Sequence, residues 1–231
     1  MSRDTRDSTA IEVEGLRKVY GSGPGAVEAL RGIDVTLSRG EFVGLVGPSG
    51  SGKTTLLNLL GCLDRPTSGT IRIWGEDLFT RSNREMGRYR SESVGFIFQS
   101  FNLFPTLTAH ENVEYPLLLR GVPSAERGRR VAGILERVAL AHKAVRRPDE
   151  LSSGEKQRVA IARALVHTPK IVLADEPTAN LDSETGSKVV DLLSGLNRES
   201  GTTFIISTHD AAIIGRLGRV LGIRDGRLID S

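Results

Sequence analysis

The sequence has little cysteine, few aromatic residues and no long hydrophobic run. The single cysteine among its 231 residues, Cys62, excludes a disulfide scaffold and suits a reducing compartment, and we interpret it as a buried helix residue. A membrane-spanning helix needs about 20 mostly apolar residues, and the longest charge-free stretch, residues 93–109, is interrupted by polar residues and Pro105. The first residues, MSRDTRDSTA, lack the apolar segment of a secretory signal. We therefore predict a solvated tail over residues 1–10, in a protein that is cytosolic or held at a membrane through partners.

Hydrophobic residues make up 39% of the chain, which is enough to form a real core and excludes intrinsic disorder. The net charge of +3 decides little. Basic residues outnumber acidic ones between Arg120 and Arg147, a balance that nucleic-acid binding would also require. This stretch has no interleaved aromatic residues and follows apolar helical spacing, so we favour a solvated helix face and expect no nucleic-acid partner.

Short apolar segments alternate with helical patterns at both ends of the chain. Strands are predicted at residues 11–16, 33–37, 42–46, 70–74 (antiparallel), 94–98, 171–174, 204–207 and 220–223, and helices at 53–63, within 109–164 and at 189–196. Alternation of strands and helices predicts an α/β fold with a mostly parallel sheet. The helical middle of the chain is then a lobe inserted into that core.

Residues 47–54, GPSGSGKT, fit the pattern G-x-x-x-x-G-K-[ST] between a predicted strand and a predicted helix. Glycines allow consecutive backbone N–H groups to surround an anion, and the helix N-terminus adds positive potential. Lys53 can neutralise the β- and γ-phosphates, and the Thr54 hydroxyl can ligate Mg²⁺. The alternative is a glycine-rich turn without a ligand. We predict that the loop binds phosphate through Gly47, Pro48, Ser49, Gly50, Ser51, Gly52, Lys53, Thr54 and the adjoining Thr55.

The apolar segment 171–174 leads into Asp175 and Glu176. The carboxyl ends of parallel strands are where α/β sheets bind ligands. Neighbouring strand residues face opposite ways, so the two carboxylates should act separately. Asp175 suits the coordination sphere of Mg²⁺, and Glu176 suits polarising an attacking water as a general base. By itself the pair could also be a capped strand-to-helix turn.

Residues 151–155, LSSGE, begin a predicted helix, and either Ser152 or Ser153 could cap it, with Glu155 nearby. The same geometry also makes a second anion site. Spacing does not say which anion it would serve.

Over residues 11–229 the sequence resembles the ATPases of ATP-binding cassette (ABC) transporters. Residues 47–54 match the Walker A motif, residues 171–176 match Walker B with its glutamate, and residues 151–155 match the family signature. Matches to single functional residues are Gln99 of the Q-loop, Asp182 of the D-loop (residues 180–182), the switch histidine His209 and the adenine-stacking Tyr20. Taken singly, these four residues could be a strand-end amide, a helix cap, a loop histidine and a sheet-edge aromatic.

The resemblance implies a P-loop NTPase fold of the ABC ATPase type, with an antiparallel β subdomain beside a mostly parallel core. A single ATP-binding domain would span residues 11–231. Core and β subdomain would occupy about 11–98 and 166–231, and the helical lobe about 99–165. One departure is Ser153, where the family usually has glycine. If Ser153 needs a positive φ, closure on nucleotide would be weaker.

The resemblance also implies a mechanism in which two copies pair head to tail around ATP and Mg²⁺. Each signature, through Ser152, Ser153, Gly154 and Glu155, would cover the ATP held by the partner's Walker A motif. Catalysis would involve Glu176, His209, Gln99 and Lys53, and the metal would be held by Thr54, Gln99 and Asp175. Tyr20 and Asp182 would complete the nucleotide contacts.

Several stretches resemble the MacB/LolD exporter group: residues 61–69, 95–122, 147–166 and 174–186. MacB-type exporters carry their spans on the same chain, whereas this one ends at Ser231. We therefore expect a peripheral subunit on the cytoplasmic side of the inner membrane, driving lipoprotein release or export through a separate permease. Alternatives are a MacB-like drug or peptide exporter, an FtsE-like cell-division ATPase, a soluble ABC ATPase acting on nucleic acid or ribosomes, and a non-hydrolysing regulator. Residues 100–107 could dock the permease or simply join the two lobes.

Overall fold

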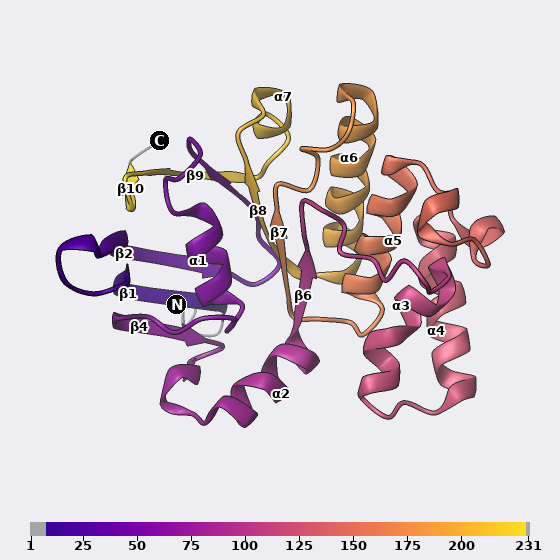
Figure 1. The fold of residues 1–231 in the computed structure, drawn as a ribbon, viewed down its shortest axis with the longest axis horizontal. Helices are drawn as coiled ribbons and strands as arrows, with labels where there is room; N and C mark the ends of the chain where they lie inside the picture. Colours follow the sequence, from indigo (N-terminus) through magenta and orange to yellow (C-terminus); the bar gives the residue numbers. More distant parts are fainter. Residues whose placement is uncertain (1–7, 230–231) are drawn as a thin grey trace, which may run out of the picture.

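The computed structural model describes residues 8–229, which form two sheets flanked by helices (Figure 1). A six-stranded sheet has the order β10-β9-β3-β8-β7-β6. Its strands are β3 (Phe42–Val46), β6 (Val94–Ile97), β7 (Ile171–Asp175), β8 (Thr203–Thr208), β9 (Arg219–Arg224) and β10 (Arg227–Ile229). All neighbouring strands pair in parallel except β9 and β10. The predicted α/β class with a mostly parallel sheet is confirmed.

Side chains of the central strands alternate between two separate hydrophobic cores. Val43, Leu45 and Ile205 belong to the core beside α1 and the second sheet. Phe204 and Ile206 belong to the core formed with the helices of the other face. Because both faces of the sheet are covered, its strands are apolar on both sides.

The second sheet is antiparallel and has the order β2-β1-β4-β5. Its strands are β1 (Thr9–Tyr20), β2 (Val27–Ser38), β4 (Ser68–Ile73) and β5 (Glu76–Asp77). Residues 1–7 of the predicted tail lie outside the described residues. Thr9 and Ala10, which we also assigned to the tail, belong instead to β1, where Ala10 is fully buried against the sheet. The reason is that antiparallel pairing with β2 extends to Thr9, beyond the alternating apolar segment.

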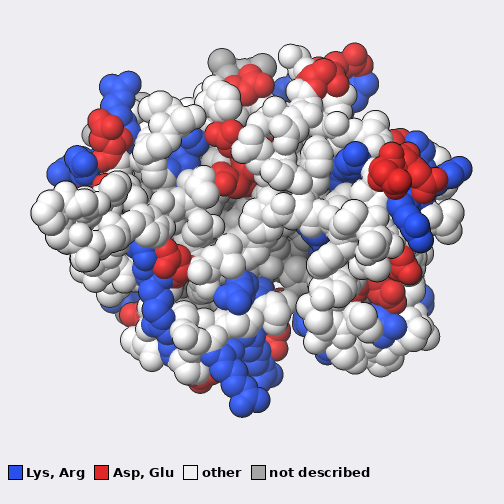
Figure 2. Space-filling view, in the orientation of Figure 1, with Lys and Arg blue, Asp and Glu red and all other residues white. Residues whose placement is uncertain are grey.

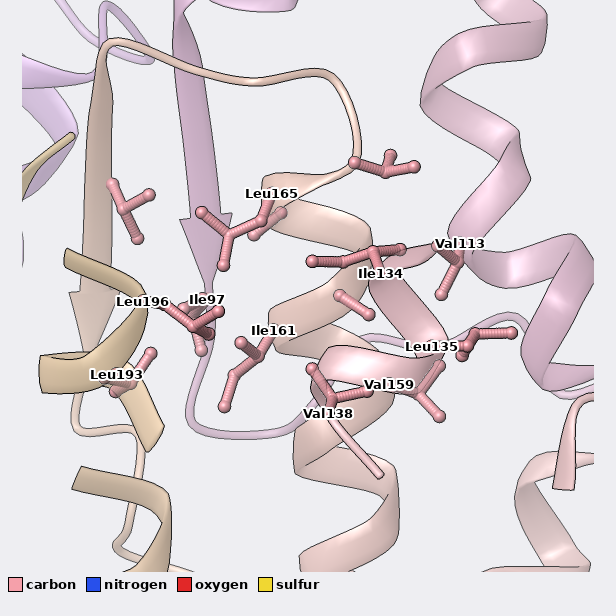
Figure 3. Packing of buried hydrophobic residues seen from close by; sticks show 14 of the residues in the cluster. Ile97, Val113, Ile134, Leu135, Val138, Val159, Ile161, Leu165, Leu193 and Leu196 are labelled. Atoms are coloured by element: carbon pink, nitrogen blue, oxygen red, sulfur yellow. The ribbon is translucent and has the colours of Figure 1, made fainter. Parts of the chain in front are cut away.

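The chain between β6 and β7 is helical and packs on one face of the six-stranded sheet. It contains α3 (Ala109–Leu119), α4 (Ser124–Arg137) and α5 (Ser153–Leu165), with short 3-10 turns at Ala141–Lys143 and Pro148–Glu150. Figure 3 shows α5 between the end of β6 and the other two helices, with Val159 and Ile161 facing their side chains. The helix therefore connects the helical lobe to the sheet.

The remaining helices are α1 (Lys53–Leu60), α2 (Asn83–Ser93), α6 (Ser183–Ser200) and α7 (Ala211–Ile214), with 3-10 turns at Gly23–Gly25 and Leu78–Thr80. The strand and helix ends differ from the predicted ones by a few residues. For example, α1 ends at Leu60 because Gly61 caps it. The sequence pattern missed α2, which has few apolar residues and begins with a capping box between Ser82 and Glu85. Within residues 8–229, no helix has the length and hydropathy needed to cross a bilayer.

Candidate active site

The glycine loop connects the end of β3 to the start of α1 at the carboxyl edge of the six-stranded sheet. Gly52 caps α1 with a φ of 109°, and a Cβ there would lie 2.8 Å from the carbonyl oxygen of Ala29. Both observations require glycine at this position. The Ser51 hydroxyl is buried and has no hydrogen-bond partner among the described residues. An unpaired donor inside a loop of this shape fits a bound anion.

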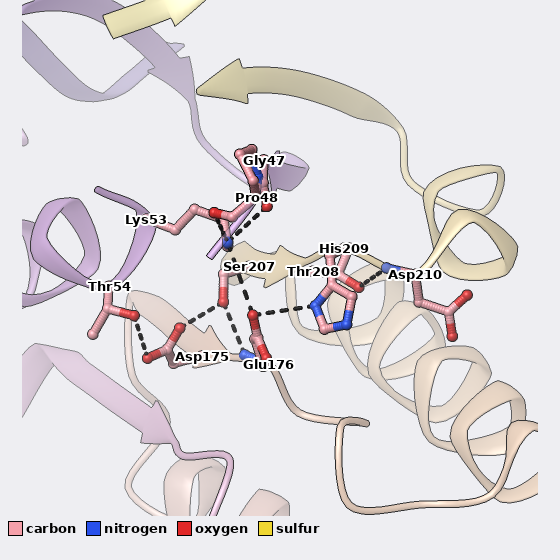
Figure 4. Close-up of polar contacts among 10 residues, drawn as sticks. All are labelled: Gly47, Pro48, Lys53, Thr54, Asp175, Glu176, Ser207, Thr208, His209 and Asp210. Carbon is pink, nitrogen blue, oxygen red and sulfur yellow. Dashed lines mark hydrogen bonds and ion pairs between the residues drawn. The ribbon is translucent and has the colours of Figure 1, made fainter. Parts of the chain in front are cut away.

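Lys53 is the first residue of α1, and it is buried despite its charge. Its Nζ donates hydrogen bonds of 2.8 and 2.9 Å to the carbonyl oxygens of Gly47 and Pro48. The same atom lies 3.8 Å from Oε1 of Glu176 (Figure 4). A buried ammonium needs such partners. Two carbonyl oxygens and a carboxylate surround this ammonium, which is positioned to meet an anion in the loop.

The Asp175 carboxylate at the end of β7 is held by hydroxyl groups on both sides. The Thr54 hydroxyl donates to Oδ2 at 2.9 Å, and the Ser207 hydroxyl donates to Oδ1 at 2.6 Å. Ser207 also accepts a hydrogen bond of 2.8 Å from the backbone N–H of Glu176. Parallel pairing of β7 with β8 places Asp175 beside Ser207. Sequence reasoning missed Ser207, because one serine in an apolar strand gives no signal.

Glu176 follows β7 in a left-handed backbone conformation, with a φ of 44°. Its carboxylate is mostly shielded, and Oε1 lies 3.3 Å from Nδ1 of His209, whose side chain is 63% exposed. His209 follows β8, the strand next to β7. Non-glycine residues in this conformation cluster at functional sites. Here the turn directs the Glu176 carboxylate toward Lys53 and His209 rather than along the strand.

These residues fit the magnesium ion implied by the sequence. Within residues 8–229, no group of three or more His, Cys, Asp or Glu side chains could hold a metal by itself. Mg²⁺ in phosphate sites usually takes one or two carboxylates, substrate oxygens and water. The paired oxygens of Thr54 and Asp175 provide such a partial oxygen set.

A cleft of about 570 Å³ lies over this edge. It is lined by Ser49, Gly50, Gly52, Lys53, Thr54, Thr55, Gln99, Asp175 and Glu176 from the predicted set, together with Val27, Glu28, Ala29, Arg31, Asp225 and Gly226. The structure therefore brings together the three predicted metal ligands, three of the four predicted catalytic residues and much of the phosphate loop. The fourth predicted catalytic residue, His209, lies beside Glu176. Gln99 is exposed, and its backbone carbonyl oxygen accepts a hydrogen bond from the Asn180 side chain in the loop before α6.

The signature residues line a different cleft, of about 540 Å³, which shares no lining residue with the first. It contains Ser152, Ser153, Gly154 and Glu155 at the start of α5 and Asp182, the N-cap of α6. Within one chain, then, the structure separates these five predicted nucleotide contacts from the phosphate loop.

The start of α5 is built by a capping box. The N-cap is Ser152, whose hydroxyl accepts from the Glu155 backbone N–H, while the Glu155 carboxylate accepts from the Ser152 backbone N–H. A hydrogen bond of 2.5 Å from Lys143 and those from Ser152 lower the pKa of Glu155 to about 2. Ser153 is the first helical residue and does not have a positive φ. We expected weaker closure on nucleotide only if Ser153 needed a positive φ, and this condition is not met.

Tyr20 ends β1 and is 41% exposed. It does not line the first cleft, but its hydroxyl lies beside Thr55, which does. Burial and the hydrogen bond to Asp64 raise the pKa of the Tyr20 phenol. The phenol is therefore a donor at neutral pH.

The chain thus has two separate clefts, one at the phosphate loop and one at the start of α5, and known proteins share this sequence pattern. Residues 30–179 match the family model described as ABC transporter. The chain belongs to the ABC transporter family. Its fold is that of an ABC ATPase cassette, and it is the ATP-binding and ATP-hydrolysing component of such a transporter.

Within the ABC transporter family, the chain is similar to two kinds of curated ATP-binding protein and to a solved cassette structure. The chain is 46% identical to the lipoprotein-releasing system ATP-binding protein LolD of Geobacter metallireducens, over 96% of this chain and 99% of LolD. It is 49% identical to the macrolide export ATP-binding/permease protein MacB of Nitrosomonas europaea, over 95% of this chain but only 33% of MacB. A dimeric ATP-binding cassette in a post-hydrolysis state bound to ADP and Pi is 41% identical, with a TM-score of 0.87, and the match covers 95% of this chain and 97% of that one. The resemblance to the MacB/LolD group is confirmed.

Proposed function

We propose that two copies of this ABC ATPase close head to tail around two ATP molecules, and that hydrolysis reopens them to drive a separate membrane permease. The observation that supports this proposal is the division of predicted nucleotide contacts between two clefts that share no residue. A second copy can bring its signature cleft to the phosphate loop of the first. The related solved cassette is itself dimeric. Since ATP would favour the closed dimer, its removal can do mechanical work.

Within each site we assign the roles from the contacts described above. Lys53 binds the β- and γ-phosphates after leaving its carbonyl partners. Glu176 accepts a proton from the attacking water, and His209 orients the carboxylate and the γ-phosphate. Thr54 and Asp175 hold Mg²⁺, joined by Gln99 at the cleft wall. The metal supplies neutralisation of charge on the phosphate oxygens.

The permease would dock in an apolar groove of about 390 Å³ between α2, β6, α3 and α5. Figure 2 shows this hollow between α2 and the helical lobe. Its lining includes Phe96, Phe98 and Leu119 together with Arg90 and Arg163, and it contains no carboxylate. A complementary segment of the permease would therefore be apolar with an acidic side chain.

The segment 100–107, which we predicted either to dock the permease or to join the lobes, contributes only Asn102 to this groove. Arg163 donates to the carbonyl oxygens of Phe101 and Asn102, and Asn112 donates to those of Phe104 and Leu107. Leu103 packs on the core of the helical lobe. We infer that this segment mainly joins β6 to α3 and shapes one rim of the groove.

For the cargo, we propose lipoprotein release, as the name of the LolD relative indicates for that protein. The subunit would drive this release from the cytoplasmic side of the inner membrane. Identity to LolD extends over nearly the whole of both chains. A MacB-like exporter is the second candidate, because identity to MacB is equally high within the ATPase part. The basic stretch 120–147 does not favour nucleic acid, since Arg127, Arg130, Arg137, Lys143 and Arg146 are in ion pairs.

The proposal is tested by measuring the mass of the full chain by light scattering with and without ATP and Mg²⁺, together with phosphate release. We expect a monomer without nucleotide and a transient dimer with ATP, and neither dimer nor hydrolysis for Lys53→Ala. Co-expression with the product of the neighbouring gene should give a complex if that gene encodes the permease. Hydrolysis by a chain that stays monomeric at all ATP concentrations would contradict the dimer mechanism.

A further inference from the structure

Three side chains form a polar cluster at the end of β1. Asp64, in the loop after α1, accepts the hydroxyl hydrogen of Tyr20 at 3.0 Å through Oδ2 and the ammonium of Lys18 at 2.7 Å through Oδ1. The same Lys18 Nζ lies over the Tyr20 ring, 4.7 Å from its centroid. The Asp64 carboxylate thus binds both the Tyr20 hydroxyl and the Lys18 ammonium, which covers one face of the Tyr20 ring.

The backbone around this cluster is fixed as well. The Val19 N–H donates to the Thr67 hydroxyl at 2.9 Å, and the Thr67 N–H donates to the carbonyl oxygen of Arg17 at 2.9 Å. Lys18 also donates to the carbonyl oxygen of Arg65 at 2.8 Å. The loop that follows α1 is therefore bound to the strand end that carries Tyr20. Since α1 begins at the phosphate loop, the ring is positioned relative to the phosphate site.

We propose that Asp64 is a positioning residue that locks Tyr20 as a pre-oriented platform for the purine base of ATP. This inference rests on the proposed binding of ATP by this chain and on the adenine-stacking role that the family resemblance predicts for Tyr20. Lys18 covers one face of the ring, so the base stacks on the opposite face. Tyr20 is 41% exposed, and without the lock its ring would sample several rotamers. Asp64 itself contacts no part of the nucleotide.

The contact between Asp64 and Tyr20 should affect how tightly the chain binds the base of ATP and should not affect how tightly it binds the phosphates. Ordering one side chain on binding changes a dissociation constant by about threefold to tenfold. Inorganic triphosphate has no base, so its affinity should not depend on Tyr20 or Asp64. The ratio of the two dissociation constants therefore separates positioning of the ring from general stabilisation of the fold.

The experiment measures dissociation constants of the full chain for ATP and for inorganic triphosphate, by competition with a fluorescent ATP analogue. Asp64→Asn and Tyr20→Phe should each weaken ATP by about threefold to tenfold and leave triphosphate unchanged. An amide at position 64 has one acceptor oxygen for the two donors Tyr20 and Lys18, so both single variants weaken the same Tyr20–Asp64 contact. The double variant should therefore be no weaker than either single one. Asp34→Asn is the matched control: Asp34 also accepts a backbone N–H in the antiparallel sheet, from Gly15, without contacting Tyr20.

The remaining outcomes would overturn the inference. Equal weakening of ATP and triphosphate in Asp64→Asn would show that Asp64 supports the loop rather than the ring. Unchanged ATP binding in Tyr20→Phe would show that the hydroxyl bond is dispensable, and this variant decides the matter even if Asp64→Asn does not fold. Tyr20→Ala separates the stacking role of Tyr20 from the positioning role of Asp64. If this variant binds ATP normally, Tyr20 is not a platform for the base. If this variant binds ATP more weakly while the other variants do not, Tyr20 contacts the base but Asp64 does not position it.

Discussion

Nδ1 of His209 lies 3.3 Å from Oε1 of Glu176, the same oxygen that lies 3.8 Å from the Lys53 ammonium. The two contacts place one carboxylate oxygen between the ammonium to which we assign phosphate binding and a group on the neighbouring strand end. Moving either partner therefore changes the position of the oxygen that we assign to water activation. Glu176 connects the phosphate loop to the loop after β8.

Replacing Glu176 by glutamine should separate ATP binding from hydrolysis. The amide keeps the shape of the side chain but cannot accept a proton, so turnover should fall at least about tenfold while ATP still binds and holds the dimer together. Phosphate release and light scattering with ATP measure the two effects. Glu184→Gln, at an exposed ion pair of α6 with Lys188, is the control. Normal turnover by Glu176→Gln would exclude the general-base role.

Ser207→Ala should impair both carboxylates of the site at once. The Ser207 hydroxyl is buried, donates to Asp175 and accepts from the Glu176 backbone N–H, so its loss leaves that N–H unpaired. We expect turnover to fall by about tenfold and half-maximal activity to require more Mg²⁺. A magnesium titration of phosphate release measures both. Ser194→Ala, on α6, should match the unchanged chain, and a fall in turnover without any change in magnesium dependence would contradict the role of Ser207 at Asp175.

Ser207 also shows where sequence reasoning stops. The phosphate loop, Asp175, Glu176 and the segment 42–46 were predictable, because each combines residue type with a local pattern. The bonds of Ser207 depend on β7 and β8 being neighbours, and no local pattern encodes that adjacency. Similarly, the inclusion of Thr9 and Ala10 in β1 is decided by pairing with β2 rather than by hydropathy. Tertiary contacts, rather than propensity, determined these features.

Two neighbouring signature positions should differ in how strongly substitution affects them. Ser153 has no positive φ, so Ser153→Gly should change turnover by less than about tenfold. A Cβ on Gly154 would lie 2.5 Å from Cγ2 of Thr185 in α6, so Gly154→Ala must shift the Thr185 side chain or separate the two helices. We expect Gly154→Ala to lose at least about tenfold in turnover and to destabilise the fold by about 1–3 kcal/mol. A gain of tenfold or more in Ser153→Gly would show instead that serine is a handicap.

The capping carboxylate of α5 should contribute stability that depends on pH. The pKa of Glu155 is lowered to about 2, chiefly by the hydrogen bond from Lys143, from an ordinary value of 4.5. A lowered pKa in the folded state stabilises the protein above pH 4.5, and this contribution is lost as pH falls toward 2. Glu155→Gln should therefore be less stable by about 1–2 kcal/mol at neutral pH, after allowance for partial solvent screening.

Urea unfolding at neutral pH and at about pH 3 measures this difference. The gap between Glu155→Gln and the unchanged chain should narrow as pH falls. Glu136→Gln, at an exposed position of α4, should show no such change. A gap that stays constant over this range would mean that the charge on Glu155 is not what stabilises the helix start.

Leu119, at the end of α3, is 70% exposed and lines the apolar groove that we assign to the permease. Leu119→Glu places a carboxylate where the groove otherwise has none, so an acidic, apolar docking segment should be repelled. Val145→Glu is the matched control, since Val145 is 78% exposed and lies outside the groove. Co-purification with the co-expressed permease should fall at least about tenfold for Leu119→Glu alone, while both variants bind ATP normally. Equal loss of the permease in both variants would place the docking surface elsewhere.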